Sequence, residues 1–117
     1  MNKPGIVTAI PKSRYKFGEF TVTVLGDIES SDGREYHHIL AVIRGNNPEP
    51  GLYVTAERSA PAQSDDGDYT MRIIMRDGDG VIGASDAWGD RDTFVNEALA
   101  IVSKMLNLSD EIPYQLM

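Results

Sequence analysis

Residues 92–106 constrain the fold more than any other segment, because their apolar side chains repeat at helical spacing over an unusually wide arc. On a wheel of about 100° per residue, this arc spans roughly half the circumference, whereas the stripe of an ordinary surface helix covers ~100°. Such a helix must be cradled by a curled sheet, or by a sheet and a partner. Leu99 and Val102 lie well within the arc and are expected to be buried. The arc contains Phe94, Val95, Ala98, Leu99, Ile101, Val102, Met105, Leu106 and Leu108.

The chain before this helix consists of apolar segments separated by polar turns. Short segments of this kind are typical of antiparallel strands joined in a meander. Residues 39–43 are apolar on both faces and indicate a central strand. Pro11 is expected to close the first strand, since proline cannot donate to a ladder, and to leave residues 11–16 as a loop. The expected strands are residues 6–10, 17–25, 35–44, 52–57, 69–76 and 81–87.

These elements predict a single α+β domain over residues 1–117. We expect a curved, mostly antiparallel meander sheet of five to six strands, with one C-terminal amphipathic helix packed on one face. Asp90 or Asp92 is expected to cap the start of the helix. Residues 107–110 are expected to end it, because Pro113 prevents its continuation.

The composition argues against several classes of protein. The chain has no cysteine, which excludes a disulfide framework and a thiolate zinc site and fits a reducing, cytoplasmic setting. It contains no apolar run long enough for a signal peptide or a membrane span, so no membrane partner is expected. The formal net charge of −7 argues against nucleic-acid binding, which needs a basic surface. Residues 11–17 interleave basic and aromatic side chains, but we interpret them as a solvated loop.

Residues 78–83 match the dinucleotide-binding pattern G-x-G-x-x-G letter for letter. That motif requires a strand before it and a helix immediately after it. Here the residues that follow resemble a strand, and Asp77 and Asp79 would repel a pyrophosphate. We therefore interpret residues 77–80 as a tight hairpin turn, because Asp-Gly favours the positive φ values of such turns. No cofactor is expected.

Acidic residues gather in loops that a meander brings to one end of its sheet. Alternate loops of a meander share an end, so residues 26–34, 59–68 and 86–92 are expected to meet there. No loop presents the spaced oxygen ligands of a tight calcium site, so we expect only weak, diffuse binding of a divalent cation. The candidate ligands are Asp32, Asp65, Asp66, Asp68 and Asp90.

His37 and His38 are the two histidines of the chain and are adjacent in an expected strand. Neighbouring residues of a strand point to opposite faces, so the two rings are expected on opposite sides and unable to bind one metal ion together. Because the chain has no further histidine or cysteine, the sequence predicts no zinc site.

No catalytic motif emerges, and three functions stay open. The first is a non-enzymatic protein-interaction module that forms a weak homodimer or binds another protein, since one helix cannot cover all the expected apolar surface. The second is a small-ligand or divalent-cation domain that uses the acidic end. The third is an enzyme built on scattered carboxylates such as Glu35 and Asp86. Candidate interface residues for the first function are Trp88, Ile74 and Leu25.

Overall fold

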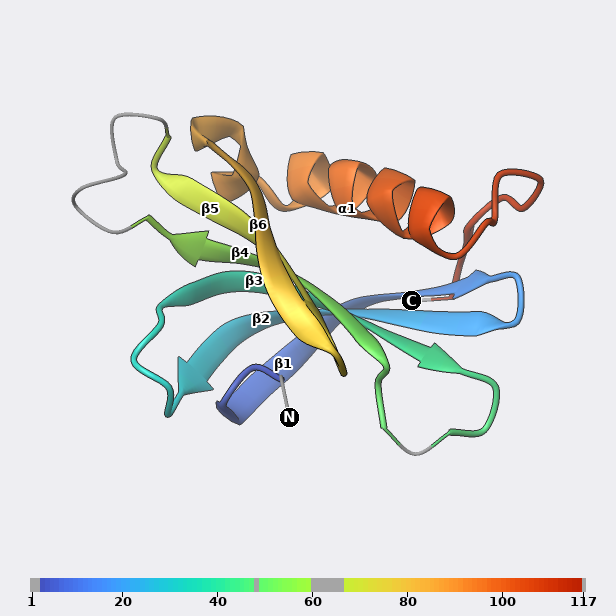
Figure 1. The fold of residues 1–117 in the computed structure, drawn as a ribbon, viewed down its shortest axis with the longest axis horizontal. Helices are drawn as coiled ribbons and strands as arrows, with labels where there is room; N and C mark the ends of the chain where they lie inside the picture. The colour runs from blue at the N-terminus through green and yellow to red at the C-terminus, as the bar shows by residue number, and fades with distance from the viewer. Residues whose placement is uncertain (1–2, 48, 60–66, 117) are drawn as a thin grey trace.

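The computed structural model describes residues 3–47, 49–59 and 67–116 and places them in one antiparallel sheet and one long helix (Figure 1). The strands lie in the order β6-β5-β4-β3-β2-β1-β7, so strands that are consecutive from β1 to β6 are also neighbours in space. This arrangement is the predicted α+β meander with one C-terminal helix. The elements are β1 (Ile6–Phe17), β2 (Phe20–Ser30), β3 (Tyr36–Arg44), β4 (Leu52–Arg58), β5 (Tyr69–Met75), β6 (Gly78–Ser85), the short 3-10 helix η2 (Asp86–Gly89), α1 (Arg91–Met105) and β7 (Tyr114–Gln115).

The sheet has seven strands rather than the five to six expected. The additional strand is β7, whose two residues pair with Tyr15 and Lys16 of β1. A strand of two residues has no alternation of polar and apolar side chains, so a sequence pattern cannot reveal it. β7 covers a short part of one sheet edge, and β6 forms the other edge.

The first hairpin is longer than predicted. The expected loop at residues 11–16 is wrong, because β1 continues through Pro11 to Phe17 and the turn lies at residues 18–19. Pro11 is tolerated because register shifts in the β1–β2 ladder lie on both sides of it. On the other side of β1, β7 pairs only with Tyr15 and Lys16, so no neighbouring strand among the described residues needs a hydrogen bond from residue 11 there. Edge positions and bulges are where sheets accept proline. Gly18 has a φ of 61°, a conformation that favours glycine in so tight a turn.

The β5–β6 hairpin also turns at a different position from the one predicted. Met75 pairs with Gly78, so the turn is formed by Arg76 and Asp77 rather than by residues 77–80. β6 therefore begins before residue 81, where the sequence pattern placed its start. The glycine-rich motif lies within this strand.

One face of the sheet forms a hydrophobic core with α1. Phe94, Val95, Ala98 and Val102 of the helix are buried, which confirms the prediction for Val102. Leu99 is only partly buried, and Met105 is exposed, so the buried stripe is narrower than the apolar arc. The reason is that the sheet curls around its other face rather than around α1. The sheet contributes Val22, Val24, Leu40, Val42, Leu52, Val54, Ala56 and Met71 to this core.

Both ends of α1 follow from local chemistry. The Asp90 carboxylate accepts hydrogen bonds from the backbone N–H of Thr93 at 3.0 Å and from its hydroxyl at 2.7 Å. Asp90 is therefore the helix cap, and Asp92 lies in the first turn. After the last turn, Asn107 has a φ of 57°, in the left-handed region that asparagine tolerates better than most residues. The predicted end of the helix is confirmed.

The face of the sheet opposite α1 is also buried at its centre. Ile39 and Thr55 are fully buried there, and Ile74 is 2% exposed. The sheet curls around this face until Arg34, in the loop after β2, reaches Asp79 of β6 with an Nη1–Oδ2 distance of 3.9 Å. Figure 1 shows β6 crossing in front of the middle strands. Ile74, one of the candidate interface residues, is therefore not on an exposed surface, because the curled sheet shields this side.

Four charged side chains hold the curl together: Arg34, Glu57, Arg72 and Asp79. Glu57 is buried, and its Oε1 accepts a hydrogen bond from Arg72 Nε at 2.9 Å. Arg72 also reaches Asp79 at 3.5 Å. Two arginines thus balance two carboxylates. Because a buried carboxylate without a partner is strongly destabilising, the burial of Glu57 depends on Arg72.

We predict that Arg72→Leu lowers the free energy of unfolding by about 3 kcal/mol, because it leaves Glu57 buried with only the more distant Arg34. Combining Arg72→Leu with Glu57→Met should restore most of the loss, since apolar side chains replace buried ion pairs well. Urea titration of the three proteins measures both effects. A double variant less stable than the single variant would contradict this role for the pair.

Candidate functional site

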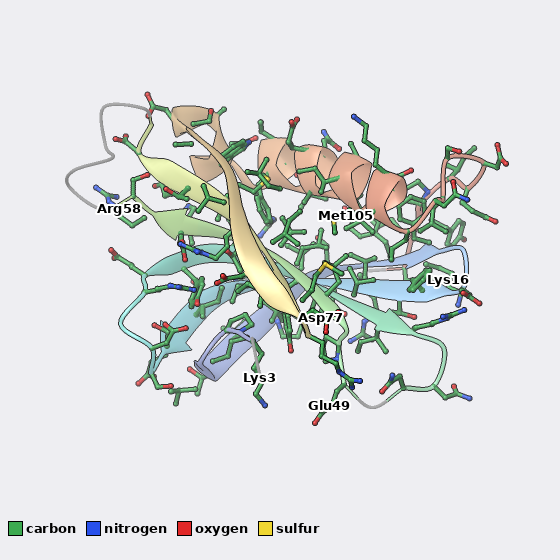
Figure 2. All side chains as sticks on the ribbon, viewed as in Figure 1. Lys3, Lys16, Glu49, Arg58, Asp77 and Met105 are labelled. Atoms are coloured by element: carbon green, nitrogen blue, oxygen red, sulfur yellow. The ribbon has the colours of Figure 1, made fainter. Side chains whose placement is uncertain are left out.

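The loop after β2, the start of β5 and η2 meet at one end of the sheet, as the meander predicted. The backbone N–H of Arg58 donates to the carbonyl of Glu35 at 2.8 Å, which joins the end of β4 to the start of β3. The backbone N–H of Asp68 donates to Asp86 Oδ1 at 2.8 Å and joins the start of β5 to η2. Figure 2 shows Arg58 at this end of the molecule and Lys16 at the opposite end.

Hydrogen bonds to the Asp32 carboxylate hold the loop after β2 in place. Its Oδ2 accepts hydrogen bonds from the backbone N–H of Gly5 at 2.9 Å and from the hydroxyl of Tyr36 at 2.5 Å, and its Oδ1 accepts one from the backbone N–H of Arg34 at 3.0 Å. Burial alone would raise the pKa of Asp32, but these hydrogen bonds outweigh it and hold the pKa below its usual value. Burial, followed by the bond to Asp32, raises the pKa of Tyr36 well above its ordinary value. Both carboxylate oxygens of Asp32 therefore have protein partners.

The remaining aspartate candidates do not form a metal site with Asp32. Asp90 caps α1, and its side-chain hydrogen bond with Thr93 lowers its pKa. Asp68 is exposed, and Asp65 and Asp66 lie outside the described residues. Within residues 3–47, 49–59 and 67–116, no three histidine, cysteine, aspartate or glutamate side chains are placed to hold a metal ion.

His37 and His38 lie side by side, contrary to the prediction that they point to opposite faces. Their ring centroids are 4.4 Å apart. Tyr36 pairs with Glu57 and His38 pairs with Ala56, so His37 is an extra residue in a β-bulge of β3. A bulge interrupts the strict alternation of side chains, and here it brings both rings to the face that carries α1.

These two rings line a cavity of about 520 Å³ at the acidic end, which we call the histidine cavity. His37 contacts Tyr69 with a centroid distance of 4.9 Å, and its Nε2 lies 3.0 Å from the carbonyl oxygen of Gly89. Arg58 stands over the Tyr69 ring at 5.9 Å. The lining residues come from five strands or their flanking loops and from α1: Lys12, Gly26, Asp27, Ile28, Glu35, Tyr36, His37, His38, Arg58, Tyr69 and Arg91.

His38 is buried between His37 and α1. Its ring stacks on Phe94 with a centroid distance of 5.4 Å. Neither ring nitrogen has a hydrogen-bond partner among the described residues. Burial is the largest cause that lowers the pKa of His38, and His37 lowers it further. The neutral form of His38, at the junction of β3 and α1, is therefore favoured more than in an exposed histidine.

The histidine cavity contains residues that sequence reasoning missed. Arg58, Tyr69 and Arg91 belong to β4, β5 and α1, and no local motif connects them. Their proximity depends on strand register, which a single sequence does not give. Of the two carboxylates considered for catalysis, Glu35 lines this cavity, whereas Asp86 is outside its lining and bonds the backbone of Asp68.

The glycine-rich segment of residues 78–83 lies in β6 and is followed by more of that strand rather than by a helix. This context differs from the strand–turn–helix unit that binds a dinucleotide. The expectation that a strand rather than a helix follows the motif is confirmed.

The residues expected at an interface occupy different environments. Ile74 is buried by the curl and offers no surface, and Leu25 is partly exposed. Trp88 is partly buried in η2 and lies next to Gly83 of β6, with its ring 3.7 Å from the position that a Cβ of that glycine would occupy. Of these residues, Trp88 therefore lies beside the edge of the sheet.

The two edges of the sheet are protected to different degrees. The β1 edge carries Pro11 and several register shifts and is partly covered by β7. β6 contains one charged residue, Asp79, and this side chain turns toward Arg34 and Arg72. Val81 is 55% exposed and Ile82 is 44% exposed, and a register shift in this region is the only irregularity between β5 and β6. Charges, prolines and covering elements are what keep an edge strand from pairing, and β6 has few of them.

No protein-family model, no curated protein and no solved structure matches the chain. In the part of the chain that the structure describes, no helix has both the length and the apolar character needed to cross a membrane.

We predict that stability falls as the pH drops through the ordinary histidine value of 6.5. Below that value the unfolded chain takes up a proton at residue 38 that the folded chain binds less readily, so acidification favours unfolding. Asp32 and Asp90, whose pKa values are lowered, contribute stability at pH values above their ordinary pKa of 3.8. They therefore do not change the stability near the histidine value.

Urea titrations at about pH 7.5 and about pH 5.5, on either side of the histidine value, measure this effect. His38→Phe should flatten the dependence, because the phenylalanine ring preserves the stacking on Phe94 but does not titrate. An unchanged dependence in His38→Phe, or greater stability at the lower pH, would contradict the assignment to His38.

Proposed function

We propose that this protein is a non-enzymatic interaction module that self-associates through the open edge of β6. The observation that carries the proposal is the contrast between the two edges. One is interrupted and partly covered, whereas β6 presents eight residues, Gly78–Ser85, without an outward-directed charge. A cytoplasmic setting belongs to the same proposal and is supported by the absence of cysteine.

The chemistry of an edge strand favours a second copy of the chain as partner. The outer N–H and C=O groups of an edge strand are free to form a ladder with another strand. Two copies of β6 can pair antiparallel about a two-fold axis, and each copy then supplies the same surface. Such pairing requires no deep groove and no side-chain motif.

Apolar side chains beside the edge support this pairing. Val81 and Ile82 are exposed on β6, and Trp88 flanks the strand at Gly83. The strand is short and its register shift limits the uninterrupted ladder, so the buried area is small. We therefore propose a weak to moderate homodimer rather than an obligate one.

We predict that Val81→Lys shifts the monomer–dimer equilibrium toward the monomer, because a lysine on an edge strand opposes pairing with a second strand. Sedimentation equilibrium at concentrations up to several hundred micromolar measures the shift. Ile112→Lys is the matched control: Ile112 is 86% exposed, lies outside β6, and receives the same charge.

The wild-type chain and Ile112→Lys should associate with the same affinity, and Val81→Lys should be weaker. A wild-type chain that is only monomeric at these concentrations would refute self-association. Weaker association of Ile112→Lys with no change in Val81→Lys would place the interface at the C-terminal segment instead.

A further inference from the structure

We propose that the histidine cavity binds a small organic oxyanion, a carboxylate or phosphate group on a body that also carries hydroxyl or N–H groups. This inference is independent of self-association, because the cavity lining contains no residue of β6. The cavity volume of about 520 Å³ is in the range of sites that hold small ligands.

The charges that line the cavity leave a positive pair for the anionic group. Lys12 and Asp27 neutralise each other through an ion pair of 2.7 Å. Arg58 and Arg91 then remain, and neither forms an ion pair with a carboxylate of the described residues. Arginine presents several N–H groups in one plane and binds carboxylate and phosphate oxygens in pairs.

The aromatic wall of the cavity orients Arg58. Its guanidinium stands over Tyr69, whose ring in turn packs against His37. A guanidinium over a ring gains from the contact of its face, while the N–H groups at its edges stay available for a ligand. Arg58 is therefore positioned by an aromatic ring and not by a carboxylate of the described residues, as an anion site requires.

His37 adds a polar contact of defined chemistry. A carbonyl oxygen can only accept, so the 3.0 Å contact with Gly89 places a proton on Nε2 of His37. The other ring nitrogen, Nδ1, is then an acceptor in the neutral ring and a donor in the charged ring. It can meet either a hydroxyl of the ligand or an oxygen of its anionic group.

Glu35 defines the other part of the ligand. Glu35 lines the same cavity, and its carboxylate repels an anionic group placed close to it. A hydroxyl or N–H group of the ligand can donate to Glu35, while the anionic group lies toward Arg58 and Arg91. The lining thus favours one anionic group together with neutral donors over a ligand that is anionic throughout.

The test is an NMR titration of the full chain with ribose 5-phosphate as the phosphate probe and gluconate as the carboxylate probe. Sodium chloride at matched ionic strength corrects for general salt effects. We expect saturable shifts of the backbone amides at Arg58, Tyr69 and Arg91. Arg58→Gln and Arg91→Gln should each weaken binding about tenfold or more, as for the loss of a charged hydrogen bond. Glu35→Gln should tighten it, because the glutamine amide oxygen still accepts a hydrogen bond from the ligand while the repulsion of the anionic group is removed.

Arg76→Gln is the control, because Arg76 is exposed and lines a different cavity of about 570 Å³. Saturation by either probe supports the proposal and identifies the preferred anionic group. Absence of saturation by both probes at about 10 mM, beyond the range of millimolar affinity, overturns it. Weaker binding in Glu35→Gln, or equal losses in Arg76→Gln and Arg58→Gln, also overturns it.

Discussion

The burial of Glu57 beside Arg72 is the interaction on which the shape of this molecule depends. The Glu57 carboxylate is buried near the end of β4, on a sheet face that has no helix over it among the described elements, and it is stable there only with a charged partner. Arg34 and Asp79 extend the same group of charges from the loop after β2 to the far edge strand. The curl that results buries Ile39, Thr55 and Ile74 without a second layer of structure.

This curl determines which surfaces are available for function. α1 covers one face, and the curl shields the other, so the apolar central strand β3 is buried on both sides. Exposed apolar side chains remain at the β6 edge, in the first half of β1 and in the C-terminal segment. At the acidic end, the β3 bulge and the start of α1 enclose the histidine cavity. Association through an edge and binding in a cavity can therefore occur on separate parts of one small fold.

Local patterns in the sequence predicted much of the fold. Residues 39–43, apolar on both faces, identified the central strand, and Ile39, Leu40, Ala41 and Val42 are buried there. The cap at Asp90 and the end of α1 at Asn107 follow from side-chain chemistry within a few residues. These features could be predicted because their physical causes are local.

Features that depend on distant partners could not be predicted. To predict that β1 continues through Pro11, one must know that β1 lies near an edge of the sheet. To predict that the rings of His37 and His38 lie side by side, one must know the register of β3 against β4. The burial of Ile74 depends on the curl of the sheet, which brings Arg34 and Asp79 together although they are far apart in the chain. The candidate site was the least predictable feature, because the arginines of the histidine cavity come from separate elements.

The central claim, that the sheet curls over its second face and shields it, can be tested by thiol labelling. The chain has no cysteine, so Ile74→Cys and Val81→Cys each create a unique thiol, on neighbouring strands of the same sheet. The account predicts that the thiol at position 81 reacts with a maleimide much faster than the thiol at position 74, when each rate is normalised to the urea-unfolded protein. Equal normalised rates at the two positions would contradict the shielding of the second face by the curl.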